Sequence, residues 1–243
     1  MRTMMTRFCL VILFFYGVLP YLLSRGFGWK VIKKSTHLSE VALTFDDGPN
    51  PLYTPMLLDI LKKYNVKATF FVLGYKAQLY PDIIKKIHDE GHQIGIHNEA
   101  HLPNWSMRPK TVQKGVERTS QLIYSLIGER ATVYRPPWGM LNAYDLLKKT
   151  PYTIVLWSLM AEDWRIAGGI PKIVSHLLKS KGGDIILLHD CGKTFGAQEM
   201  APMNTIQALD IVLPELQDRG LQFVKLDKWI AKDPRICRTD TMG

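Results

Sequence analysis

Two adjacent carboxylates follow a short apolar run in the sequence TFDDGPN, residues 44–50. An Asp-Gly-Pro turn, in which an Asp side chain accepts backbone N–H bonds, would account for one of them. A metal or acid–base site at the end of a strand would use both Asp46 and Asp47, because adjacent residues of an extended segment point to opposite sides. One could then bind a metal ion while the other accepts a proton, and the residues alone do not say which does which.

Two of the seven histidines, His97 and His101, are four residues apart in the sequence HNEAH. On a helical turn this spacing presents both imidazoles to one point. With a carboxylate from another strand end they would form a ligand set that leaves positions open for water and substrate, as a catalytic zinc site requires. A divalent ion there would lower the pKa of its water to about 7 and polarise a carbonyl. Zinc suits these ligands, and cobalt, nickel or manganese could occupy them.

Hydrolysis of an amide or ester also requires a base and an acid. His189, alone at the end of another apolar run, is the natural acid, because the pKa of histidine lies near the operating range. Arg135 would orient one carboxylate and keep it ionised, and Asp163 is available to hold Arg135 in turn. Cys191 is close to His189 in the sequence, but no base has the spacing that a nucleophilic cysteine needs.

Strands and helices must bring these residues together, and the apolar pattern after residue 40 alternates between the two. Amphipathic helical stretches separate the apolar runs, and strand–helix alternation repeated about seven times predicts a parallel sheet with helices outside it. The expected strands cover residues 41–45, 68–73, 93–97, 132–135, 153–159, 184–189 and 222–226. The expected helices cover residues 54–64, 81–90, 111–127, 143–149, 170–180 and 203–219.

The polar clusters all fall where an expected strand ends. In a parallel barrel, chemistry gathers on the loops at the carboxyl ends of the strands. The residues at those ends are Asp46 and Asp47, His97, Arg135, Asp163 and His189. Each cluster alone has a structural explanation, but five clusters at one end of the sheet predict an active site.

Five motifs, TFDDGP, HNEAH, RPPWG, EDW and LLH, occur in this order. Over about residues 40–230 the chain therefore resembles the polysaccharide deacetylases of carbohydrate esterase family four. The resemblance implies an α/β fold, a distorted (β/α) barrel with about seven parallel strands, here preceded by one N-terminal membrane segment.

The resemblance also assigns roles by position. It implies that Asp46 is the catalytic base and that Asp47, His97 and His101 are the metal ligands. It further implies that Arg135 orients Asp46 with support from Asp163 and that His189 is the general acid. The resemblance also implies that the Trp138 backbone N–H stabilises the oxyanion and that Trp164 and Leu187 line a pocket for the acetyl methyl group.

Three positions depart from the family pattern. Asn98 replaces the usual Ser or Thr after the first histidine, and Asn can also act as a cap. Trp138 stands where Tyr or Phe is usual, which reshapes the cleft. Met160 stands where an acid often precedes Asp163, with Glu162 beside that aspartate instead. This last departure weakens the expected support of Arg135.

Composition limits the other classes of function. The chain has 243 residues, 47% hydrophobic and 22% charged, which suffices for one sizeable core. Its charge of +9 is uneven, because residues 1–40 carry +5 and the other 203 residues +4. A basic cluster beside an apolar segment indicates a membrane flank rather than a nucleic-acid surface. Three cysteines, Cys9, Cys191 and Cys237, make neither a disulfide framework nor a zinc finger.

Residues 8–23 form an uncharged apolar segment behind the basic start MRTMMTR. The residues after it offer only poor signal-cleavage sites, which favours an uncleaved anchor over a removed signal peptide. We therefore expect an N-terminal membrane anchor or signal segment with basic flanks in residues 1–32 and a polysaccharide deacetylase-like catalytic domain in residues 33–243. The expected location is the cell membrane, with the catalytic domain outside the cytoplasm; secretion after signal cleavage is the alternative.

The resulting hypothesis is a metal-dependent N-deacetylase that acts on an amino-sugar glycan of the cell envelope, either peptidoglycan or a chitin-like oligosaccharide. One alternative keeps the chemistry but acts on a lipid-linked sugar at the membrane. The other is a non-catalytic glycan-binding relative, which would be expected to lack a ligand, the base or the acid, and none is missing. We predict no nucleic-acid partner and no protein partner.

Overall fold

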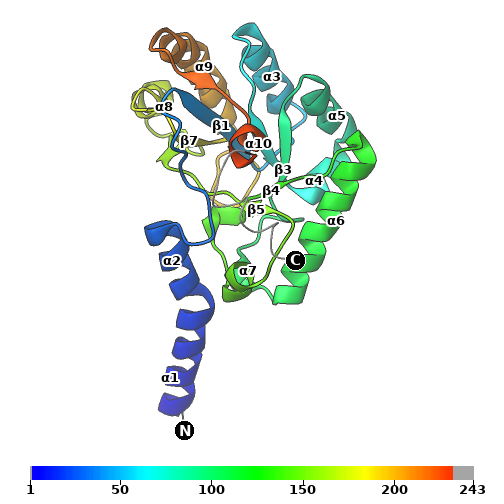
Figure 1. The fold of residues 1–243 in the computed structure, drawn as a ribbon, viewed down its shortest axis with the longest axis vertical. Coiled ribbons are helices and arrows are strands. Elements are labelled where there is room, and N and C mark those ends of the chain that lie inside the picture. The colour runs from blue at the N-terminus through cyan, green and yellow to red at the C-terminus, as the bar shows by residue number, and fades with distance from the viewer. Residues whose placement is uncertain (1, 232–243) are drawn as a thin grey trace.

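A curled sheet of short parallel strands forms the centre of the computed structural model, which describes residues 2–231 (Figure 1). Within these residues the strand order is β5-β4-β3-β2-β1-β7-β6, and β8 pairs with β1 beside this path. The α/β class and the distorted barrel of about seven parallel strands are therefore confirmed. The strands are β1 (Glu40–Asp46), β2 (Thr69–Val72), β3 (Gln93–Ile96), β4 (Val133–Tyr134), β5 (Thr153–Ile154), β6 (Leu159–Met160), β7 (Ile185–His189) and β8 (Gln222–Phe223).

The expected strand at residues 153–159 is wrong as a single strand. Its beginning, β5, pairs with β4, and its continuation, β6, pairs with β7 at the other edge of the sheet. Between them the backbone changes partner, because the Leu156 N–H donates to Ile32 O (2.8 Å) and the Ser158 N–H donates to Ile185 O (3.0 Å). One extended segment thus joins both edges and curls the sheet into its barrel-like form.

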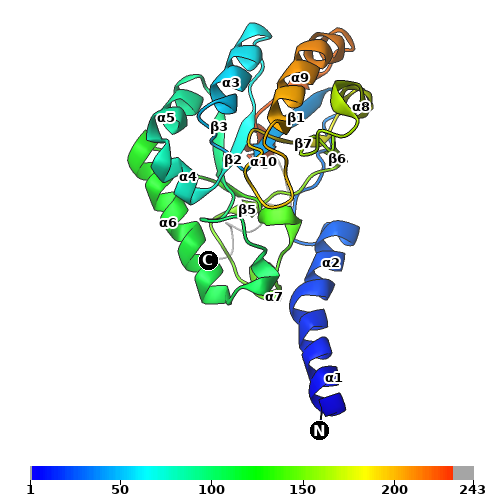
Figure 2. The same ribbon diagram turned by 180° about the vertical axis from the view of Figure 1, so that it is seen from behind.

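Helices cover the outside of the sheet (Figures 1 and 2), and all six expected helices are present. Two further helices, α4 and α10, were not expected. They have six and five residues, which are too few to show a helical period in the sequence. The helices are α3 (Tyr53–Lys63), α4 (Gly74–Leu79), α5 (Pro81–Asp89), α6 (Pro109–Ile127), α7 (Ala143–Leu147), α8 (Gly169–Leu177), α9 (Ala201–Asp218) and α10 (Leu226–Ile230). Two short 3-10 turns, η2 (Asn104–Ser106) and η3 (Pro137–Gly139), lie in loops.

The alternation of β1 explains how a buried strand can carry polar side chains. Phe45 belongs to the large core between the sheet and the helices, whereas Ala42 belongs to a smaller cluster with residues of β2, β4 and β7. Because side chains alternate along a strand, Thr44 and Asp46 share the Ala42 face. Both are buried, and Asp46 is the last residue of the strand. The strand thus delivers one carboxylate to the interior of the barrel at its carboxyl end.

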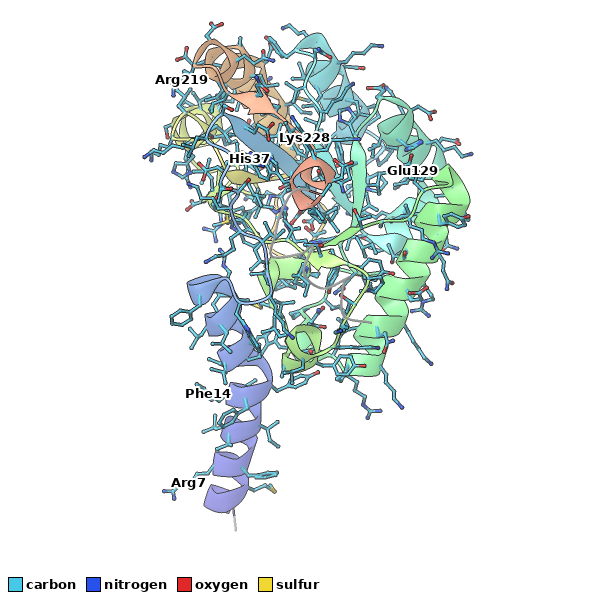
Figure 3. The ribbon with its side chains drawn as sticks, viewed as in Figure 1. Arg7, Phe14, His37, Glu129, Arg219 and Lys228 are labelled. Carbon is cyan, nitrogen blue, oxygen red and sulfur yellow. The ribbon has the colours of Figure 1, made fainter. Side chains whose placement is uncertain are left out.

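A helical rod precedes the domain and projects from it (Figures 1 and 2). It consists of α1 (Arg2–Leu13), a π-helical turn η1 (Phe14–Val18) and α2 (Leu19–Phe27). Met5–Phe27 has 23 residues and contains an 18-residue window with a mean hydropathy of 1.8, so it is long and apolar enough to cross a membrane, by length and composition alone. Arg7 and Phe14 project from the exposed part of the rod (Figure 3).

The junction between rod and domain is part of the core. Val31 and Ile32 are buried, and Ile32 forms a parallel bridge with Val155. The division of the chain at residues 32 and 33 stays a prediction, and these contacts favour a domain that begins slightly earlier. Cys237 and the other residues after 231 lie outside the described part of the chain.

Candidate active site

The two adjacent aspartates have different partners at the end of β1. Asp46 Oδ1 accepts a hydrogen bond of 2.7 Å from the Arg135 Nη1–H. Asp47 has a positive φ of 77°, which is uncommon for residues other than glycine. Its Oδ1 atom lies 3.4 Å from His97 Nε2 and 3.2 Å from His101 Nε2. The structure therefore separates the pair as expected, one carboxylate beside an arginine and the other beside two histidines.

Asp47, His97 and His101 could hold a metal ion, since one ligand atom from each lies within 4.8 Å of the others. Two ligands bound tetrahedrally to zinc at about 2.0–2.1 Å lie ~3.3 Å apart, close to the separations from Asp47 Oδ1. This oxygen is buried and has no hydrogen-bond partner within residues 2–231. His97 Nδ1 lies 2.7 Å from Arg135 O, and a proton donated there leaves the lone pair of Nε2 facing Asp47. The donor set thus fits a divalent metal ion.

The protonation states also suit metal binding. Burial raises the pKa of Asp47, but His97, His101 and His189 outweigh it and hold that pKa far below its usual value. Burial lowers the pKa of His101 to about 4, against the opposing effect of Asp47. At neutral pH the carboxylate is ionised and the His101 imidazole is neutral. These are the states that metal coordination requires.

The helical turn expected at residues 97–101 is wrong. This segment is an irregular loop in which Asn98 has a φ of 64°. The Gly74 N–H donates to Asn98 O (3.0 Å) and the Tyr75 N–H donates to Glu99 O (3.0 Å), so the start of α4 fixes the path of the loop. The two imidazoles converge because the loop is pinned in this way, with ring centroids 5.4 Å apart.

Asn98 holds the same loop through its side chain. Its Nδ2–H donates to Asn104 Oδ1 (2.8 Å), and its Oδ1 accepts from the Tyr134 hydroxyl (2.7 Å). Asn104 and Tyr134 are buried, and they are also hydrogen-bonded to each other (2.7 Å). Its Nδ2–H group also donates to Leu102 O (3.2 Å), so the asparagine that stands in place of the usual Ser or Thr has three hydrogen-bond partners.

His189 is paired with Asp163. It ends β7, which pairs with β1 on the side away from β2 and β3. His189 Nδ1 lies 2.8 Å from Asp163 Oδ1, and the His189 backbone N–H donates to Asp163 Oδ2 (2.8 Å). The Thr205 hydroxyl donates to the same Oδ2 (2.9 Å). Burial lowers the pKa of His189, but Asp163, with smaller effects from Asp47 and Asp46, raises it to about 9. His189 is therefore protonated at neutral pH, as a general acid must be.

The expected contact between Asp163 and Arg135 is wrong. Arg135 is fully buried inside the barrel, and other acceptors take its N–H groups. Its Nε donates to Val155 O (3.1 Å), its Nη2 to Leu156 O (3.1 Å), and its Nη1 to both Thr44 Oγ1 (2.8 Å) and Asp46 Oδ1. Carbonyls of the segment that joins the two sheet edges thus replace the expected aspartate.

Asp46, Asp47, His97, His101 and His189 border a cleft of about 440 Å³. Trp138 and Trp164 lie on its walls, with ring edges against His101 (centroids 4.1 Å apart) and His189 (5.7 Å). Leu187, on β7, contributes to the floor. The aromatic and aliphatic residues expected to contact the acetyl group therefore line the same cleft as both carboxylates.

Several residues of the site gave no signal in the sequence. The Thr194 hydroxyl donates to Asp47 Oδ2 (2.6 Å), and Lys76 Nζ donates to Asp47 O (2.7 Å) and Cys191 Sγ (2.9 Å). Both belong to segments without a motif, and only their proximity in space reveals them. Cys191 is buried and free of disulfide bonds, and it lies outside the lining of the cleft.

The N-terminal rod also reaches the cleft, since Tyr21 and Arg25 of α2 are among its lining residues. Trp105 packs against Gly17 of the rod. No expectation drawn from the sequence placed the apolar segment beside the catalytic residues.

Known proteins resemble the chain in sequence and structure. The family model described as Polysaccharide deacetylase matches residues 33–155. The chain is 36% identical over 193 residues to a peptidoglycan-N-acetylglucosamine deacetylase of Bacillus cereus, covering 77% of this chain and 86% of that protein. It is 36% identical to peptidoglycan-N-acetylglucosamine deacetylase PgdA of Listeria monocytogenes, covering 81% of this chain but only 40% of that protein. The solved structure of the Bc1960 peptidoglycan N-acetylglucosamine deacetylase superposes with a TM-score of 0.77 at 33% identity, covering 85% of this chain and 95% of that one.

Proposed function

Because the chain belongs to the polysaccharide deacetylase family, we propose that it is a metal-dependent hydrolase that removes N-acetyl groups from an amino-sugar glycan of the cell envelope. The convergence of Asp47, His97 and His101 in the same cleft as Asp46, which is paired with Arg135, and His189, which is paired with Asp163, is the observation that carries this function. The similar proteins named as peptidoglycan deacetylases support peptidoglycan as the substrate class.

The residues divide the reaction into two proton transfers. A divalent metal ion held by Asp47, His97 and His101 would act as a Lewis acid on the acetyl carbonyl and favour the loss of a proton from water. Asp46 accepts that proton as the water oxygen attacks the carbonyl carbon. His189 donates a proton to the sugar nitrogen as the C–N bond breaks, which releases acetate and leaves a free amine.

The surroundings keep each group in its working state. The Arg135 guanidinium holds the Asp46 carboxylate in place through a bond of 2.7 Å. Asp163 fixes the ring of His189 and favours its protonated form. We assign the Trp138 backbone N–H to stabilisation of the oxyanion, and Trp164 and Leu187 to the pocket for the acetyl methyl group, and all three residues line the cleft.

We propose zinc as the metal, because two histidines and one aspartate suit it, and cobalt, nickel or manganese could use the same ligands. We also propose that Met5–Phe27 anchors the protein in the cell membrane with the domain outside the cytoplasm. The length and hydropathy of this segment support the anchor. Cell fractionation tests the anchor. A shortened protein released into the medium would favour a cleaved signal instead.

Acetate release from peptidoglycan and chitooligosaccharides, with metal content measured on the same samples, tests the proposed chemistry. His97→Ala and His101→Ala should lower bound metal and activity together, because each removes a ligand. Asp46→Asn should retain the metal and lose about 10²–10⁴-fold in turnover, because it removes a proton acceptor of nearly the same shape. If Asp46→Asn lost the metal while Asp47→Asn retained it, the two aspartates would have the opposite roles.

A further inference from the structure

The N-terminal rod forms part of the wall of the active-site cleft. Tyr21 and Arg25 line the cleft together with Asp46, His101 and Trp157. They are four residues apart on α2, so they lie on the same side of the helix. The segment that the sequence marks as a membrane anchor therefore takes part in the site where the substrate binds.

Specific contacts hold the rod in this place. The Arg25 guanidinium carbon lies 4.2 Å from the centre of the Trp157 ring, and its Nη1 donates to Trp157 O (3.4 Å). The Tyr16 hydroxyl donates to Met107 O (2.7 Å). A Cβ atom on Gly17 would come within 3.1 Å of Trp105 Cβ, so glycine permits the close approach of the rod to η2. In both ribbon views α2 lies beside the end of the domain that carries α7 (Figures 1 and 2), and the two helices are in contact.

Arg25 brings an unneutralised positive charge to the cleft. Within residues 2–231, its side chain contacts the ring and carbonyl of Trp157 and forms no ion pair with a carboxylate. A guanidinium with free N–H groups in a cleft is a binding group for a phosphate or carboxylate.

The position of Arg25 along the rod places this binding group at a membrane surface. Arg25 lies in the last turn of Met5–Phe27, and Phe27 and Trp29 are exposed directly after it, followed by Lys30. Aromatic and basic residues of this kind are typical of the membrane–water interface. Because Tyr16 and Gly17 pack against the domain, the part of the rod that is free to lie in hydrocarbon precedes Tyr16, about 14 Å of helix from Arg25. The cleft therefore lies on the side of the domain from which the rod enters the membrane.

The chemistry of an acetylated amino sugar connects these two observations. The acetamido group is on C2, and the neighbouring C1 is the carbon through which such a sugar is joined to a carrier lipid by phosphate. A sugar bound with its acetamido group beside Asp47 would thus carry an anionic group one carbon away. In a polymeric glycan, peptidoglycan included, C1 is joined to another sugar, so no phosphate lies at that position for Arg25 to bind.

We propose, on the basis of the deacetylase function above, that the substrate is an N-acetyl amino sugar linked through phosphate to a membrane lipid, and that Arg25 binds the phosphate. The rod then has two roles, since it keeps the enzyme at the membrane and supplies the binding group for the membrane-linked end of the substrate.

The test uses the full-length, metal-loaded protein in lipid nanodiscs with three substrates: polyprenyl-diphospho-N-acetylglucosamine, soluble N-acetylglucosamine 1-phosphate, and chitotetraose. We expect kcat/KM to be highest for the lipid-linked sugar. Arg25→Gln should raise KM for both phosphorylated sugars by about 10–100-fold, which is the contribution to binding expected of one charge-assisted hydrogen bond. The rise in KM for chitotetraose, which offers Arg25 no phosphate, should be smaller than the rise for either phosphorylated sugar.

Arg165→Gln is the matched control, because Arg165 also borders the cleft, near the ring of Trp164, but belongs to the domain. A loss in Arg165→Gln rather than Arg25→Gln, or an equal loss for all three substrates in Arg25→Gln, would overturn the role of Arg25. Equal use of chitotetraose and the lipid-linked sugar by the wild type would overturn the substrate class and leave the deacetylase function intact. Equal use of the two phosphorylated sugars would overturn the membrane carrier. No acetate from these three substrates or from the peptidoglycan assayed above would overturn the deacetylase function itself.

Discussion

Asp163→Asn should move the pH range in which the enzyme works. Asp163 bonds both the ring and the backbone of His189, at 2.8 Å each, and its charge outweighs the burial that would otherwise lower the His189 pKa. Asparagine keeps the shape and removes the charge. The pKa of His189 should therefore fall from about 9 to its ordinary value of 6.5 or below. At pH 7.5 the protonated fraction would drop from about 97% to about 9% or less.

The assay is acetate release as a function of pH by metal-replete wild type and variant. The falling limb of kcat/KM should move to lower pH by one unit or more, and the rate deficit should be at least about tenfold at pH 7.5 and smaller at pH 6. A metal ion beside His189 lowers its pKa in both proteins, so the difference between the two profiles is the measured quantity. Glu162→Gln is the control, because Glu162 is the carboxylate next to Asp163 in the sequence but pairs with Lys172 rather than with His189.

Stability should follow the same titration. The His189 pKa is higher in the folded protein than in the unfolded chain, so the stabilisation by Asp163 is complete below pH 6.5 and disappears as the pH rises through about 9. Asp163→Asn should therefore lower the free energy of unfolding at pH 6, by at most about 3 kcal/mol, and by less at pH 10. A folded, metal-replete variant whose falling limb coincides with that of the wild type would refute this assignment of the acid.

Two further predictions concern residues outside the motifs. Thr194→Val should weaken metal binding by about 10–100-fold, because it removes the hydroxyl that donates to Asp47 Oδ2. Thr194→Ser should retain most of the affinity. If competition with a chelator gave equal metal affinities for the wild type and Thr194→Val, this role of Thr194 would be contradicted. A chain that begins at Lys30 should keep the domain fold. A chain that begins at Ser35 should have a free energy of unfolding in urea lower by about 4 kcal/mol or more, because it loses the buried Val31 and Ile32 and two backbone hydrogen bonds of Ile32. Equal urea midpoints for the two chains would place the domain boundary after Ile32.

The sequence predicted the residues of the site better than the contacts among them. The end of an apolar run is visible in the sequence, and parallel strands bring their carboxyl ends to one edge, so the convergence of Asp47, His97 and His189 follows from the order of the elements. The partner of Asp163 does not follow in this way. It depends on where the chain crosses from β5 to β6, and that crossing places backbone carbonyls rather than Asp163 around Arg135.

The contact between the N-terminal segment and the domain could not be predicted from the sequence, for a different reason. Hydropathy describes the environment that residues 8–23 prefer, but it does not say which face of the helix contacts the domain. Gly17 and the buried Ser24 make that contact, and a glycine and a serine in an apolar helix carry no distinct signal. Only the packed structure shows that Arg25 reaches the cleft.

The backbone of the site explains why its residues could be named from the motifs while their orientation could not. Asp47, Asn98, Trp138 and Glu162 all follow strand ends and have positive φ values of 77°, 64°, 54° and 54°. Such conformations cost free energy for residues other than glycine and persist only where the surrounding structure enforces them. At Asp47 the enforcement is visible, because the buried Lys76 ammonium bonds its carbonyl oxygen at 2.7 Å. The loop sequence supplies the functional groups, and the packed fold behind them determines where each one points.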